Sequence, residues 1–166
     1  AAPAAPPAVS CAERAASTVV GEFAAGSGLV FKDSVEVTSM PDPKVEGVTV
    51  HVSSMKRPIT DRLQRNFFTD PSQVSITATR TGDVKVLEPI DTTKEGEVVF
   101  KSHKNLFFKT TNVRRIYDKE SHCLVYVSYS TRWTQDMDES NSRFRTSISA
   151  VPLEGVLPRA ALAKAK

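Results

Sequence analysis

The chain has 166 residues, of which 40% are hydrophobic and 25% charged, an ordinary composition for one globular domain with a modest core. Its 22 basic and 19 acidic residues leave a net charge of +3, which is too small to indicate a nucleic-acid partner. No apolar run approaches the roughly 18 residues that a membrane-spanning helix needs, so the sequence predicts no transmembrane segment.

The first part of the chain is rich in alanine and proline and holds no apolar block. We expect residues 1–27 to form a flexible arm, residues 28–157 a β-domain, and residues 158–166 a flexible basic tail. A processed chain would begin in this way after removal of a targeting segment, as would an engineered sequence; we expect an exported or organellar protein. The thiols of Cys11 and Cys123 are either free or paired, and the sequence leaves this open.

The middle of the chain reads as one short strand after another. LVFKDSVEV (29–37) leads towards a turn rich in proline and aspartate. VTVHVSS (48–54) and QVSITATR (73–80) alternate between apolar and polar residues, as half-buried strands do. KVLEPI (85–90) predicts a short strand that Pro89 interrupts.

One segment has helical spacing instead. In TDRLQRNFF (60–68), Leu63 and Phe67 lie four residues apart and would form one apolar stripe on a short helix. Two interpretations stay open: the stripe covers an open end of the β-core, or its aromatic residues remain exposed beside arginines as an anchor for an acidic partner surface. The residues concerned are Arg62, Arg65, Phe67 and Phe68.

The stretch GEVVFKSHKNLFFKTTNVRRIYD (96–118) interleaves basic residues with aromatic and β-branched ones. A nucleic-acid platform would expose these aromatic residues, whereas a small domain needs them in its core, so we expect strands with solvated lysines. The adjacent Phe107 and Phe108 predict a bulge or a strand buried on both faces. Arg114 and Arg115 must point to opposite faces of their strand, so one of them should face inward and find a buried carboxylate or line a groove.

The clearest hairpin is NVRRIYDKESHCLVYVSYS, with DKESH as its turn. We expect residues 111–118 to pair with residues 123–130 and to bury Val125 and Val127. The last strand, FRTSISAV (144–151), alternates in the same way. This pattern predicts a mostly β protein, either an antiparallel β-sandwich or a partly open barrel with one short helix.

Motifs for catalysis or metal binding are missing from the sequence. The three histidines, His51, His103 and His122, have no metal-ligand spacing, and the acidic loop at 134–142 lacks the glycine and the terminal glutamate of a calcium loop. We expect no metal, no cofactor, and a non-catalytic binding or accessory module. The alternative is an uncharacterised enzyme or small-ligand-binding protein with a site near the 111–130 hairpin. Its candidate residues are Arg114, Arg115, Tyr117, His122 and Tyr126.

The segments GEVVFK, LFFKTTNVRRIYD, LVYVSYS and SISAVPL resemble the CreA family of exported bacterial proteins, and PDPKVEGVTVHVS (41–53) resembles the matching segment nearer the N-terminus. The resemblance covers about residues 28–155 and implies no biochemical activity, because none is assigned to the family. It implies that relatives carry cysteines at the positions of Val50 and Ala78, which are both missing here. Their joint loss implies that they pair in relatives and that the two strands are neighbours.

Two further features resemble plastid members of this family: the alanine-rich ends, and a helical, basic segment at 55–73 where bacterial relatives have a glycine-rich loop. We therefore expect a chloroplast location, in the thylakoid lumen or stroma, with the bacterial periplasm as the alternative. The partner we expect is a larger protein assembly and not a nucleic acid, and the oligomeric state stays open.

Overall fold

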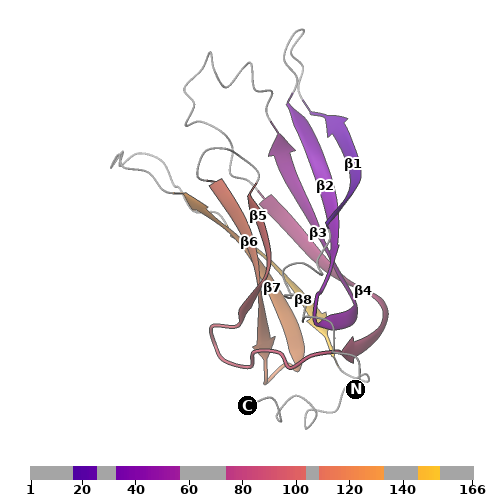
Figure 1. Ribbon diagram of the computed structural model, residues 1–166, viewed down its shortest axis with the longest axis vertical. Coiled ribbons are helices and arrows are strands. Elements are labelled where there is room, and N and C mark those ends of the chain that lie inside the picture. The colour runs from indigo at the N-terminus through magenta and orange to yellow at the C-terminus, as the bar shows by residue number, and fades with distance from the viewer. Residues whose placement is uncertain (1–16, 26–32, 57–73, 104–108, 133–145, 154–166) are drawn as a thin grey trace, which may run out of the picture.

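The protein is a β-sandwich of two four-stranded antiparallel sheets (Figure 1). The computed structural model describes residues 17–25, 33–56, 74–103, 109–132 and 146–153. Within these ranges there is no helix and no closed barrel. The predicted β-sandwich is therefore confirmed, whereas the predicted helix at 60–68 lies outside the described residues.

The strand order in each sheet follows the chain, so every strand pairs with its sequence neighbour. The first sheet contains β1 (Thr18–Ala24), β2 (Ser34–Pro41), β3 (Val45–Lys56) and β4 (Val74–Val86). The second sheet contains β5 (Glu97–His103), β6 (Lys109–Asp118), β7 (Cys123–Arg132) and β8 (Thr146–Pro152).

Alternate residues of both sheets form one hydrophobic core. The pattern in β3 is the clearest, because Val48, Val50 and Val52 are all at most 4% exposed while His51 between them is half-buried on the other side. The second sheet contributes valine, leucine and tyrosine side chains from β5 to β8 to the same cluster. These residues are Val99, Val113, Tyr117, Leu124, Tyr126 and Val151.

Several strands differ in extent from those that the sequence predicts. β4 is one continuous strand through residues that were expected to separate two short ones. β1 lies in the segment assigned to the N-terminal arm and is exposed along its whole length. β5 contains a bulge between Val98 and Phe100, where the register with β6 shifts. The pair Phe107 and Phe108, from which a bulge was predicted, lies outside the described residues.

The hairpin of β6 and β7 has the predicted register, but its predicted facing is wrong. Asp118 lies opposite Cys123 and Thr111 opposite Ser130, as expected. The core, however, takes Leu124 and Tyr126, both 0% exposed, while Val125 and Val127 point outward and are half-buried. The physical reason is that Tyr126 has a buried hydrogen-bond partner across the core, described below, so the larger aromatic side chain and not the valines occupies the interior.

The two sheets meet along one edge, where β4 passes beside β8 (Figure 1). The backbone N–H of Ile76 donates to Ser147 Oγ at 3.2 Å, and the N–H of Ala78 donates to Ser149 Oγ at 2.9 Å. These hydroxyls satisfy backbone donors of β4 that have no further strand in their own sheet. They therefore protect this edge from pairing with another chain.

Candidate functional site

The tight turn between β2 and β3 fixes a buried carboxylate. Asp42 Oδ1 accepts hydrogen bonds from the backbone N–H groups of Lys44 and Val45, each at 2.9 Å, which is the pattern of an Asx turn. The side chain of Asp42 is fully buried. The local sequence thus holds one carboxylate rigidly and aims it at the facing sheet.

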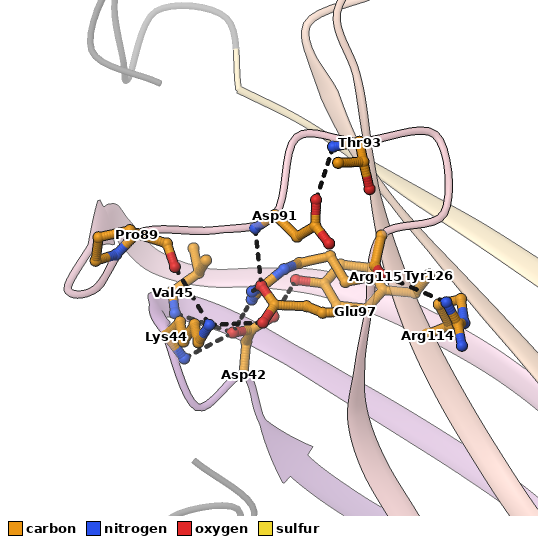
Figure 2. A network of polar contacts seen from close by, with 11 residues as sticks. Asp42, Lys44, Val45, Pro89, Asp91, Thr93, Glu97, Arg114, Arg115 and Tyr126 are labelled. Carbon is orange, nitrogen blue, oxygen red and sulfur yellow. Dashed lines mark hydrogen bonds and ion pairs between the residues drawn. The ribbon is translucent and has the colours of Figure 1, made fainter. Parts of the chain in front are cut away.

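Arg115 on β6, a residue of the second sheet, forms an ion pair with this carboxylate (Figure 2). Its guanidinium donates from Nη1 to Asp42 Oδ1 and from Nη2 to Glu97 Oε1, and only 2% of the residue is exposed. Tyr126 on β7 donates from its hydroxyl to Asp42 Oδ2 at 2.7 Å. Arg115 is the inward-facing arginine that the sequence predicts, and Asp42 is its buried carboxylate partner.

Glu97 links this pair to a second cation nearer the surface. Its Oε2 accepts from Lys44 Nζ at 2.6 Å, and its Oε1 also accepts from the backbone N–H of Asp91 at 3.1 Å. Lys44 Nζ further donates to the carbonyl of Pro89 at 3.2 Å. Residues from the β2–β3 turn, the segment before β5, and β5 to β7 therefore form one polar network that joins the two sheets (Figure 2).

A glycine places Glu97 opposite Arg115. Gly96 has a φ of +61°, and a Cβ atom at this position would lie 2.1 Å from the carbonyl oxygen of Arg115. Only glycine tolerates both the left-handed backbone and so close an approach. The next residue, Glu97, can then pair with Arg115 in the register of β5 and β6.

The network has two cations and two carboxylates, and each cation contacts a carboxylate. Burial opposes the charge on Arg115, but the adjacent Asp42 carboxylate outweighs it, so the pKa of Arg115 is raised. Burial also opposes the charge on Glu97, yet Lys44 and Arg115 hold the pKa of Glu97 below its usual value. Burial and the nearby Asp42 carboxylate raise the pKa of Tyr126. Its hydroxyl therefore stays protonated and acts as a hydrogen-bond donor to Asp42.

A cavity of about 10 Å³ adjoins Asp42 and has room for about one water molecule. Its walls are mainly apolar side chains and prolines. A cavity of this size is far smaller than the pockets that hold organic ligands. The lining residues are Met40, Pro41, Asp42, Pro43, Val50, Val99, Phe100 and Val113.

The five hairpin residues proposed from the sequence lie in three different places. Arg115 and Tyr126 belong to the buried network. Tyr117 and His122 form a second buried pair, in which the Tyr117 hydroxyl and His122 Nδ1 are 2.8 Å apart. Arg114 faces away from both, on the outer side of the second sheet. The hairpin therefore does not gather these side chains around one point, as a catalytic site would require.

Asp42, Lys44 and Glu97 were not predicted as members of the network. Asp42 lies 73 residues from Arg115 and 84 from Tyr126, so no local spacing connects them.

The remaining predicted contacts, Arg62, Arg65, Phe67 and Phe68, lie outside the described residues, and so does Cys11. Cys123 is a free, half-buried thiol. Within the described ranges no three histidine, cysteine or acidic side chains are grouped as a metal would need, and no helix could span a membrane.

The outer side of the second sheet is unusually apolar for a solvent-facing surface. We define the β5–β8 outer face as Arg114 together with six aliphatic residues. Four of these residues form one row across all four strands, in which each residue lies directly opposite its neighbour on the next strand. The other three form a parallel row across β6, β7 and β8. The first row is Val98, Arg114, Val127 and Ile148, and the second is Ile116, Val125 and Ala150.

The corresponding side of the first sheet is polar along its middle, whereas its β1 edge carries an apolar row of Phe23, Val35 and Met55, of which Phe23 is 59% exposed. Its middle rows, across β2–β4, are Ser39, His51 and Thr77, and Val37, Ser53 and Ser75. Serine, threonine and histidine are what an antiparallel sheet usually presents to water. In contrast, Ile148 is 69% exposed and Val98 42% exposed on the β5–β8 outer face. Contiguous exposed aliphatic residues of this kind mark interaction surfaces more often than plain solvent-facing ones.

Comparison with known proteins gives the family of this chain. The sequence profile of the family described as CreA protein matches residues 20–156. The chain belongs to the CreA family. It is similar to Protein CreA of Escherichia coli strain K12, with 31% identity over 122 residues that cover 72% of each chain, and equally to Protein CreA of strain O157:H7. No solved structure matches the chain. The predicted CreA resemblance is therefore confirmed.

Proposed function

We propose that this CreA protein is a non-catalytic binding module that docks onto a larger protein assembly through the β5–β8 outer face. The observation that carries the proposal is the contrast between the two outer faces of the sandwich. The middle of the first face is polar, and its apolar residues lie at the β1 edge. On the second face the exposed Val98 and Ile148 end a row that crosses all four strands, beside a second aliphatic row. Burying such side chains against a partner would contribute roughly 25 cal/mol for each Å² of apolar surface removed from water.

The buried polar network supports a structural role for these residues and not a catalytic one. Asp42, Arg115, Glu97 and Lys44 form ion pairs with one another, and the Tyr126 hydroxyl donates a hydrogen bond to the Asp42 carboxylate. A catalytic acid or base needs access to a substrate, whereas these groups face each other between two sheets. The network therefore supports a role in fixing the two sheets relative to each other.

The test compares two exposed positions on opposite faces. Ile148→Asp places a charge in the β5–β8 outer face, and Thr77→Asp places the same residue on the polar face of the first sheet. Both variants should melt close to the wild type, because neither side chain is buried. Proteins that co-purify with the wild type from its native source should be lost with Ile148→Asp and kept with Thr77→Asp. Recovery of the same proteins with both variants would contradict the proposal.

We also propose that the protein works in an exported or organellar compartment, with the chloroplast (thylakoid lumen or stroma) favoured and a bacterial periplasm as the alternative. The support is the resemblance of its alanine-rich ends and of the 55–73 segment to plastid members of the family. Fractionation of the source cells, followed by immunodetection of the chain in each compartment, tests this proposal. Detection in the cytosolic fraction alone would overturn it.

A further inference from the structure

The β5–β8 outer face holds a fixed positive charge at its centre. Arg114 lies between Val98 and Val127 in the row that crosses the sheet. Its Nη1 donates to the carbonyl of Glu95 at 2.8 Å and less closely to that of Gly96 at 3.4 Å. Its guanidinium carbon also lies 6.0 Å from the centre of the Tyr129 ring. The charge is therefore held in position before any partner arrives, which reduces the entropy lost on binding.

This charge is not neutralised on its own face. Among the described residues Arg114 forms no ion pair, in contrast to its neighbour Arg115, which has two. The nearest effect on a carboxylate is at Asp91. Its pKa is lowered mainly by hydrogen bonds from Thr93, and Arg114 adds only a small electrostatic contribution. Asp118 lies on the same side of the sheet but beyond Ile116 along β6, and Lys101 adds a second cation to this side. The face is thus apolar with a net positive centre.

We propose, on the basis of the docking function above, that the partner is a different protein that presents an apolar segment with an aspartate or glutamate opposite Arg114. A carboxylate is the group that a guanidinium best recognises, because two parallel N–H donors match its two oxygens. The surrounding aliphatic residues exclude water from the pair and so strengthen it. A second copy of the chain is the less favourable occupant, because a two-fold contact centred on this row would bring the two Arg114 guanidinium groups towards each other.

The experiment places a photo-crosslinking benzophenone side chain at position 148 of the full chain, expressed in its native source, and maps the crosslinked peptide by mass spectrometry. We expect adducts with another protein, on an apolar peptide that contains Asp or Glu. Arg114→Gln should lower the adduct yield by about tenfold or more, as the loss of a well-oriented charge pair would. Arg80→Gln is the control: Arg80 likewise donates to a backbone carbonyl, that of Gly82 at 3.2 Å, but it is exposed and lies in the first sheet. The adduct yield of the Arg80→Gln variant should equal that of the wild type.

A charge exchange then decides whether the carboxylate is the recognised group. Arg114→Glu should abolish the adduct, and replacement of the mapped partner carboxylate by arginine should restore it. Adducts between two copies of the chain, or a yield that does not respond to Arg114→Gln, would overturn the inference while leaving docking onto a protein through this face intact. Adducts with lipid alone would overturn both the inference and the proposed function. A complete absence of adducts would overturn the proposed function itself. Melting temperatures of all variants identify any that fail to fold, and Arg114→Lys, which retains the charge, should then keep a part of the yield.

Discussion

The hydroxyl of Tyr126 donates a 2.7 Å hydrogen bond to Oδ2 of Asp42, a residue 84 positions earlier in the chain and in the β2–β3 turn of the opposite sheet. Both groups are buried, and the same carboxylate accepts from Arg115 through its other oxygen. One side chain in a three-residue turn between β2 and β3 thus contacts two strands of the second sheet. The relative position of the two sheets depends on this carboxylate.

Tyr126→Phe should destabilise the protein by about 1–3 kcal/mol, because it leaves a buried carboxylate oxygen without its donor. Urea denaturation followed by circular dichroism measures the change. Tyr129→Phe is the control, since Tyr129 lies half-buried on the outer side of the same strand. Equal losses in the two variants would show that the hydroxyl of Tyr126 contributes no more than a surface hydroxyl.

Stability should fall on acidification because of Glu97. Its pKa is lowered in the folded protein from a reference value of 4.5, so the unfolded chain binds the proton more readily. The contribution of Glu97 is fully present well above pH 4.5 and is lost as the pH falls through the folded pKa. In Glu97→Gln the acid-dependent loss should be smaller, although Asp91 and Asp118, whose pKa values are also lowered, keep some of it. Urea midpoints measured from neutral to acidic pH test this, and parallel curves for the two proteins would contradict it.

The facing of the β6–β7 hairpin gives a sharp comparison. Val113 is 0% exposed, so Val113→Asp should cost several kcal/mol or prevent folding, because a charge would be buried without a partner. Val127 points to the outer side, so Val127→Asp should cost only about 1 kcal/mol. Thermal melting followed by circular dichroism distinguishes the two. A Val127→Asp variant as unstable as Val113→Asp would mean that Val127 is buried after all.

Gly96→Ala should destabilise the protein by about 1–3 kcal/mol because its backbone is left-handed. The clash of the added Cβ with the Arg115 carbonyl oxygen should increase this loss. Gly21→Ala is the matched control, because a Cβ there would meet nothing within 4 Å. Denaturant titration of both variants gives the two costs. If Gly96→Ala were as mild as Gly21→Ala, the close approach of residue 96 to β6 would be excluded.

Val50 and Ala78 lie directly opposite each other on β3 and β4, as predicted from the missing cysteines. The double variant Val50→Cys, Ala78→Cys should therefore oxidise to a bridge and gain about 2–4 kcal/mol over its reduced form. Thiol titration and melting with and without reductant measure both effects. The two single variants, which cannot form the bridge, serve as controls. Free thiols that persist under oxidising conditions would show that the pair cannot reach disulfide geometry.

The residues of the hairpin show what the sequence could and could not reveal. The pairing of β6 with β7 followed from a polar turn between two apolar runs, which is local information. The facing of β7 did not follow, because Val125 and Val127 on one side are as apolar as Leu124 and Tyr126 on the other. The buried side is the one on which the Tyr126 hydroxyl can bond to Asp42, in the β2–β3 turn of the other sheet.

The candidate site was predictable to a similar degree. Two adjacent arginines on a strand require that one face inward, so the burial of Arg115 could be inferred. Its partner could not be, because Asp42 lies in a Pro-Asp-Pro turn where aspartate is already explained by its local hydrogen bonds to Lys44 and Val45. The apolar outer face was also hidden, since it appears only when four separate strands are aligned in register.

The strand order has a consequence for how the chain folds. Because each strand pairs with its sequence neighbour, the part up to Val86 forms one complete sheet and the part from Glu97 forms the other. Neither half needs a strand from the other to complete its backbone ladder, so each can begin as a meander of local hairpins with low loop-closure entropy. The encounter of the two meanders is then the long-range step. The Asp42–Arg115 contact and the bonds from β4 to Ser147 and Ser149 of β8 can form only after it.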